Sequence, residues 1–154
     1  MASALIAYVH YIAMISIAVV LVAEHRVCMP GMTGSRVPLL ARLDLAYMGL
    51  VLLALGSGAA RVVWFGKGAA FYLHNPVFYI KIALFLAVGL ISIAPTLQFL
   101  RWRHSLNSGA ANVIADYQVI RVRRHILFEL ALFALIPLMA TLMARGIGVQ
   151  TVAQ

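Results

Sequence analysis

Four long apolar stretches, separated by short polar ones, dominate the pattern of the chain. The first, residues 4–23, has about the 20 residues that a helix needs to cross the hydrocarbon core of a bilayer. Pro, Gly and charged residues gather between the stretches, where the chain must turn. The pattern predicts an all-α fold, an integral membrane four-helix bundle with transmembrane helices at about residues 4–25, 43–63, 76–100 and 124–145.

The segments between the apolar stretches are too short to form a domain of their own, so the sequence predicts a single membrane domain over residues 1–154. Residues 110–122 form the least hydrophobic long segment, and we expect a short interfacial helix there. Pro76 suits the first turn of the third helix, with Asn75 as its cap. No Lys or Arg precedes Arg26, so the first stretch lacks the basic start of a signal peptide, and we expect a retained helix.

Composition and charge support this interpretation. Hydrophobic residues make up 64% of the chain and charged residues 10%, whereas soluble domains are about half apolar and a quarter charged. The net charge of +8 is spread over membrane loops, which gives no soluble basic domain for nucleic acid. Eight arginines fall on one predicted side, against three basic residues on the other. This bias predicts that both termini lie outside. For a multi-pass protein of the bacterial inner membrane, which is the location we expect, that is the periplasmic side.

Two polar residues inside apolar stretches are predicted to face each other. His10 lies about six residues into the first helix and Lys81 about five into the third, both from the outer side, with Arg61 close above them. One interpretation is a hydrogen-bonded pair that specifies helix packing, or a lysine that extends to the interface. The other is a cofactor site, in which the His10 imidazole is an axial ligand of haem iron and a cation meets a propionate.

A second polar layer is expected near the opposite interface. Its members are Glu24, His25, Arg42, Asp44 and Glu129. Glu24 could pair with Arg42, and Asp44 with Arg124, as interfacial ion pairs. Glu129 lies about one turn deeper, where it is either neutral or paired with His25 in a proton path.

Several motifs resemble a family of uncharacterised bacterial inner-membrane proteins, and the resemblance covers nearly the whole chain. These motifs are Tyr8-Val-His10-Tyr11, Ala23-Glu24-His25, Arg42-Leu-Asp44, Arg61-Val-Val-Trp-Phe-Gly-Lys-Gly68, Tyr72-Leu-His-Asn-Pro76 and Met143-Ala-Arg-Gly146. The resemblance implies a fold but no activity.

A second resemblance concerns the order of His10, His25 and Lys81, which is similar to that in HemJ-type protoporphyrinogen oxidases. Those are small membrane proteins that bind haem b and oxidise protoporphyrinogen. The resemblance implies that His10 is the haem ligand, that Lys81 is the essential lysine, and that His25 matches a histidine at the end of their first helix. The sequence departs from their pattern around Glu24-His25-Arg26 and in the loop that follows Arg61.

Two functions follow as hypotheses. The first is a haem-b-binding membrane redox protein, with His10 as metal ligand, Lys81 as catalytic residue, and His10, Lys81, Arg61 and His25 around the cofactor. Such a protein would be an oxidoreductase acting on a tetrapyrrole or a quinone. The second is a small non-catalytic accessory subunit, packed in the bilayer against a larger membrane complex or in a homo-oligomer. Small residues near the end of the second helix would serve that role.

Overall fold

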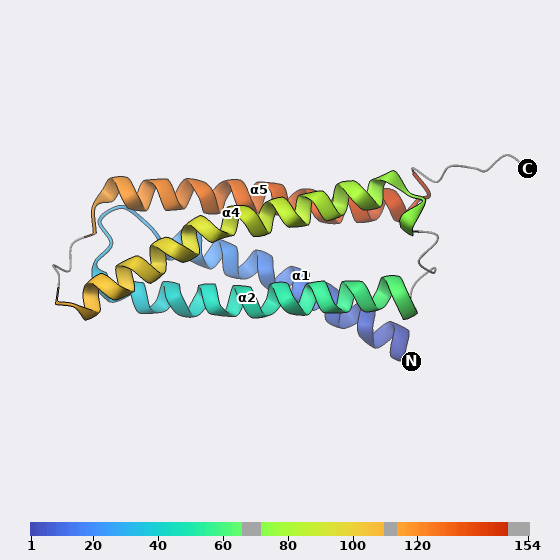
Figure 1. Ribbon diagram of the computed structural model, residues 1–154, viewed down its shortest axis with the longest axis horizontal. Helices are drawn as coiled ribbons and strands as arrows, with labels where there is room; N and C mark the ends of the chain where they lie inside the picture. The colour runs from blue at the N-terminus through green and yellow to red at the C-terminus, as the bar shows by residue number, and fades with distance from the viewer. Residues whose placement is uncertain (66–71, 110–113, 148–154) are drawn as a thin grey trace, which may run out of the picture.

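The computed structural model describes all residues except 66–71, 110–113 and 148–154. The described residues are helical apart from short connections, and no strand occurs among them. The four long helices are α1 (Ala2–Val27), α2 (Val37–Ala60), α4 (Pro76–Asn107) and α5 (Asp116–Ala144) (Figure 1). The prediction of an all-α bundle of four long apolar helices is confirmed.

Two helices begin earlier than the pattern of turn residues predicted. Pro38, one of the residues between the first two apolar stretches, lies in the first turn of α2, where proline loses no hydrogen bond. A 3₁₀ turn at Gly34–Arg36 leads directly into this helix. Asp44, expected near the start of the second helix, therefore lies about two turns inside it.

A separate interfacial helix was expected at residues 110–122, but the described residues of this segment do not form one. Residues 110–113 lie outside the described residues, and from Asp116 onward the chain is one continuous helix through Ala144. Arg121, the arginine of this segment, thus lies in the second turn of a long helix. The predicted cap of α4 is confirmed, because the Asn75 side chain accepts a hydrogen bond of 2.9 Å from the Val77 backbone N–H.

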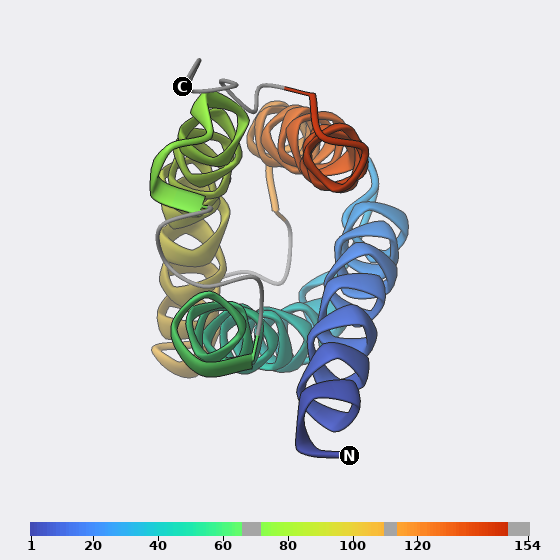
Figure 2. The same cartoon turned by 90° about the vertical axis from the view of Figure 1, so that its right-hand side faces the viewer.

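The four helices form a ring of two closely packed pairs. α1 packs most extensively against α2, and α4 against α5, while α2–α4 and α1–α5 contacts are fewer. Figures 1 and 2 show that the two pairs diverge toward the end that carries the N-terminus of α1. At the other end, α1 approaches α5 and α4 approaches α2.

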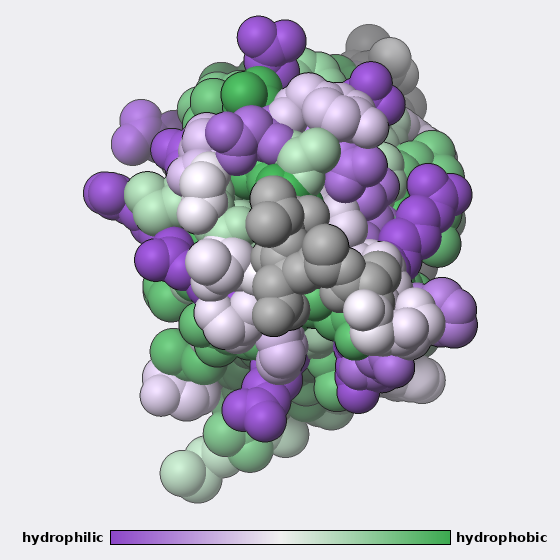
Figure 3. Space-filling model, turned by 90° about the vertical axis from the view of Figure 1, so that its left-hand side faces the viewer, coloured by the Kyte–Doolittle hydropathy of each residue, from purple (hydrophilic) through white to green (hydrophobic). Residues whose placement is uncertain are grey.

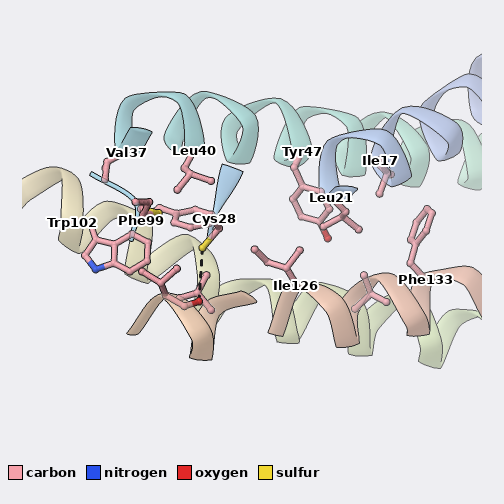
Figure 4. Close-up of a cluster of buried hydrophobic side chains, with 14 of the residues drawn as sticks. Ile17, Leu21, Cys28, Val37, Leu40, Tyr47, Phe99, Trp102, Ile126 and Phe133 are labelled. Carbon is pink, nitrogen blue, oxygen red and sulfur yellow. Dashed lines mark hydrogen bonds between the residues drawn. The ribbon is translucent and has the colours of Figure 1, made fainter. Parts of the chain in front are cut away.

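The core is a narrow strip of apolar side chains along the inside of this ring. Tyr47, Phe99 and Ile126 are among its largest fully buried members, and they come from three different helices (Figure 4). The outward faces are also apolar, with large exposed side chains such as Leu45 and Leu90. All four helices are long and apolar enough to cross a membrane, so these outward faces suit lipid.

Candidate functional site

The buried His10 is held against α2 by the small residues opposite it. Its side chain is only 9% exposed, and its Nδ1 lies 3.1 Å from the Ala54 carbonyl oxygen and 3.0 Å from the Ser57 hydroxyl oxygen. Gly58 makes room for the ring, because a Cβ added there would meet His10 Cε1 at 3.2 Å. The small residues of α2 therefore form a cradle for one edge of the imidazole.

The partners of His10 determine which ring nitrogen carries the proton when the imidazole is neutral. The Ala54 carbonyl can only accept, and the Ser57 hydroxyl already donates to the Leu53 carbonyl at 2.6 Å. Both partners thus accept from His10, which places the proton on Nδ1 and the lone pair on Nε2. No described residue forms a hydrogen bond with Nε2. A histidine whose Nδ1–H is bound to a backbone carbonyl is the usual form of a metal-ligating imidazole.

Two cations share this end of the bundle with His10. Arg61 follows α2 directly, and its guanidinium carbon lies 5.1 Å from the centre of the Tyr11 ring, in a cation–π contact. Lys81 lies in the second turn of α4, and the charges of Lys81 and Arg61 both act on His10. The structure therefore places His10, Arg61 and Lys81 at the same end of the bundle. Among the described residues, however, the hydrogen-bond partners of His10 lie on α2, and no hydrogen bond joins His10 to Lys81.

His25 does not belong to this group. It lies at the opposite end of α1, about 22 Å from His10 along the helix axis at ~1.5 Å per residue. Its side chain lines a surface depression there with Arg123. His25 therefore cannot share a cofactor face with His10.

A second buried polar cluster lies further along the bundle. It consists of Glu24 from α1, Asp44 and Tyr47 from α2, and Glu129 from α5, which are at most 9% exposed. The charges of Asp44 and Glu129 act on Glu24, and the Glu129 carboxyl group interacts with the Tyr47 hydroxyl. We call this set the carboxyl–tyrosine cluster.

Hydrogen bonding within the carboxyl–tyrosine cluster is incomplete. Asp44 Oδ1 accepts a hydrogen bond of 2.7 Å from the Thr96 hydroxyl on α4. In contrast, Glu24 Oε1, the Tyr47 hydroxyl and Glu129 Oε1 are buried without a partner of hydrogen-bond geometry. In the described part of the chain, no group of carboxylate, histidine or cysteine side chains is arranged to hold a metal ion. The cluster is therefore a costly polar site without a metal-binding arrangement.

The ion pairs expected for this layer are not formed among the described residues. Asp44 binds Thr96 rather than Arg124, and Arg42 is exposed while Glu24 is only 2% exposed. The physical reason is helix rotation: Arg42 and Asp44 are two residues apart, about 200° around the helix axis, so Arg42 faces outward when Asp44 faces the core. Glu129 likewise lies with Tyr47 and not with His25.

The four apolar spans, with polar side chains gathered in two buried layers and at the helix ends, define an integral membrane protein built as a four-helix bundle. The chain belongs to the family described as predicted membrane protein (DUF2214), whose family model matches residues 2–148. No curated protein and no solved structure matches the chain.

Sequence reasoning missed the residues that orient His10 and complete the second cluster. Ala54, Ser57 and Gly58 are among the small residues near the end of the second helix, and their spacing gives no indication of a histidine partner. Tyr47 was not singled out, because a tyrosine in an apolar span is usual in a membrane helix. Its position one turn after Asp44 was the available signal.

Proposed function

We propose that this protein binds haem b within a bacterial inner membrane and acts as a redox protein, with both termini on the periplasmic side. The observation that carries the proposal is the hydrogen bonding of His10, which occupies Nδ1 and leaves the Nε2 lone pair with which His10 would hold the haem iron. Of the five histidines in the sequence, His10 is the one among the buried residues of the structure.

The cations beside His10 suit the anionic part of the proposed cofactor. Haem b carries two propionates, which Arg61 and Lys81 would neutralise. When bound, the haem would supply one-electron transfer chemistry. The order of His10 and Lys81 resembles that of HemJ-type protoporphyrinogen oxidases, so a tetrapyrrole or a quinone is the proposed substrate class. Lys81 would place a positive charge beside the substrate or a propionate.

Absorption spectroscopy of the full chain in mild detergent tests the proposal. Protein from haem-replete cells should show a Soret band that shifts on reduction, and His10→Ala should abolish it. His104→Ala is the matched control, because His104 is exposed at the end of α4 and should leave the band unchanged. A folded, colourless wild-type protein would overturn the proposal.

The role of Lys81 has a separate readout. Lys81→Met should retain the Soret band but lower the reduction potential, because a nearby positive charge favours the reduced, less positive iron. Lys81→Arg should restore most of the potential. Equal reduction potentials in wild type and Lys81→Met would show that Lys81 does not act at the haem site. The assignment of His10 as the haem ligand would not be affected.

A second candidate function, an accessory subunit in a larger membrane complex, rests on the outward face of α2. Gly49 and Gly56 are exposed, and a Cβ added at either would meet nothing within 4 Å. Another membrane helix could therefore approach this backbone closely. If so, Gly56→Leu should release a partner that co-purifies with the wild type, whereas Gly89→Leu, at an open position on α4, should not. A wild-type protein that runs as a monomer without partners would exclude this function.

A further inference from the structure

A surface depression lies where the end of α1 meets the start of α5. Its basic side chains are His25, Arg123 and Arg124, and its apolar side chains include Met29, Ile120 and Leu127. This end of the bundle is rimmed by hydrophilic side chains (Figure 3). The depression thus combines positive charge with apolar surface at the level where membrane-spanning helices end.

The walls of the depression are fixed by contacts between the two elements. The Arg123 guanidinium, through one terminal nitrogen, donates hydrogen bonds of 3.3 Å to the His25 and Cys28 carbonyl oxygens at the end of α1. The Gly31 backbone N–H donates to Asp116 Oδ1 at 2.7 Å. Hydrogen bonds at two places therefore hold the loop that follows α1 against α5. One carboxylate oxygen of Asp116 is used in binding the Gly31 backbone N–H.

Arg123 is held in place by α1 and still has hydrogen-bond donors free for a ligand. A guanidinium has five N–H donors in a planar fork, and the contacts with α1 engage only one of its terminal nitrogens. The remaining donors can bind phosphate oxygens, with Arg124 and His25 on the same wall. No Asp or Glu lines the described depression, so nothing there repels an anion.

The apolar side chains indicate that the anion carries a hydrocarbon chain. Leu127 is 53% exposed, Ile120 42% and Met29 40%, and α5 places Leu127 two turns beyond Ile120. These side chains would face acyl chains in a bilayer, directly beside the guanidinium groups. A soluble phosphate would use the basic wall alone and leave the apolar one in contact with water.

We propose that this depression is a binding site for the phosphate headgroup of an anionic phospholipid, with Arg123, Arg124 and His25 around the phosphate and Leu127 against the first acyl chain. Basic pockets between membrane helices bind anionic headgroups in this way. The site is independent of the haem proposal, because it lies at the opposite end of α1 from His10.

Native mass spectrometry of the full chain in mild detergent tests the proposal with three probes: phosphatidylglycerol, phosphatidylcholine and inorganic phosphate. Phosphatidylglycerol should be retained in preference to phosphatidylcholine, and an excess of inorganic phosphate should not displace it. Arg124→Gln should weaken retention about fivefold. This variant should fold normally, since Arg124 is exposed and no described hydrogen bond involves its side chain. Arg123→Gln would additionally loosen the loop.

The matched control is Arg121→Gln, which removes the same charge from the same helix outside the depression. It should change retention less than twofold, and an equal loss in Arg121→Gln and Arg124→Gln would show diffuse attraction and overturn the site. Equal retention of the two lipids would overturn the requirement for an anion. Full displacement by inorganic phosphate would show a phosphate site without lipid specificity, which also refutes the proposal.

Discussion

The buried, unpartnered oxygen of Glu129 leads to a prediction about stability. Its side chain is 1% exposed, and Oε1 has no partner of hydrogen-bond geometry, so burial of this oxygen carries a desolvation cost in the folded protein. Glu129→Met replaces the carboxyl group with an apolar, unbranched side chain of similar volume, which leaves no large cavity. The substitution also removes the interaction of the carboxyl group with the Tyr47 hydroxyl, which lacks hydrogen-bond geometry in the wild type.

The magnitude follows from the cost of one unsatisfied buried polar group, about 1–3 kcal/mol and more if the group is charged. We therefore expect Glu129→Met to raise the free energy of unfolding by about 1–3 kcal/mol. Glu129→Gln keeps a polar group in the same place and should change it by less than ~1 kcal/mol. The opposite sign is expected for Asp44→Ala, because it removes the acceptor of the Thr96 hydroxyl, at a cost of about 1–3 kcal/mol.

Equilibrium unfolding in mixed micelles, followed by circular dichroism, measures all three variants on one scale. The expected order of stability is Glu129→Met above wild type and Glu129→Gln, with Asp44→Ala below them. If Glu129→Met is less stable than Glu129→Gln, then Glu129 has a favourable polar interaction in the folded protein. That result would refute the reasoning that its carboxyl group costs stability.

Three further predictions concern His10, Cys28 and Trp102. Gly58→Ala should displace the His10 ring by a few tenths of an ångström and shift its ¹⁵N resonances, whereas Gly56→Ala, which faces open space, should leave them unchanged. Burial raises the pKa of the Cys28 thiol to about 11, against the opposing charge of a nearby arginine, so the thiol stays protonated at pH 7–9 in the folded protein. Maleimide should therefore label Cys28 slowly until the protein is unfolded, and rapid labelling of folded protein would contradict this. Trp102→Phe removes the 3.0 Å indole hydrogen bond from α4 to α5 and should lower the free energy of unfolding by about 0.5–1.5 kcal/mol, measured in the same micelles.

Much of the fold was predictable because lipid imposes a simple rule on the sequence. A spanning segment must be a continuous apolar helix, so the four stretches could be recognised from length and composition alone. The common depth of His10 and Lys81 was predictable for a related reason. The rise of a helix is constant, so the number of residues from the helix end gives the depth of a side chain along the bundle.

Helix rotation was not predictable in the same way, and it decides which polar groups meet. An outward face in lipid is as apolar as an inward one, so the sequence carries little periodic signal for the buried side. Asp44 and Arg42 illustrate this, since both lie near one interface but only Asp44 faces the core. In addition, α2 begins at Val37, earlier than predicted, so Asp44 lies further from the start of its helix than expected.

The two buried polar layers differ in how completely their polar atoms are hydrogen-bonded, and this difference bears on the function of each. His10 makes hydrogen bonds at one nitrogen, and its neighbours on α2 are small enough to admit it, so its placement is locally well supported. The carboxyl–tyrosine cluster has three unpartnered oxygens, which packing alone would not favour in an apolar bundle. Residues that cost stability in a membrane interior are functional candidates for that reason. Since Glu24 lies 14 residues after His10 on the same helix, about 21 Å along its axis, substitutions in the two layers should affect stability independently.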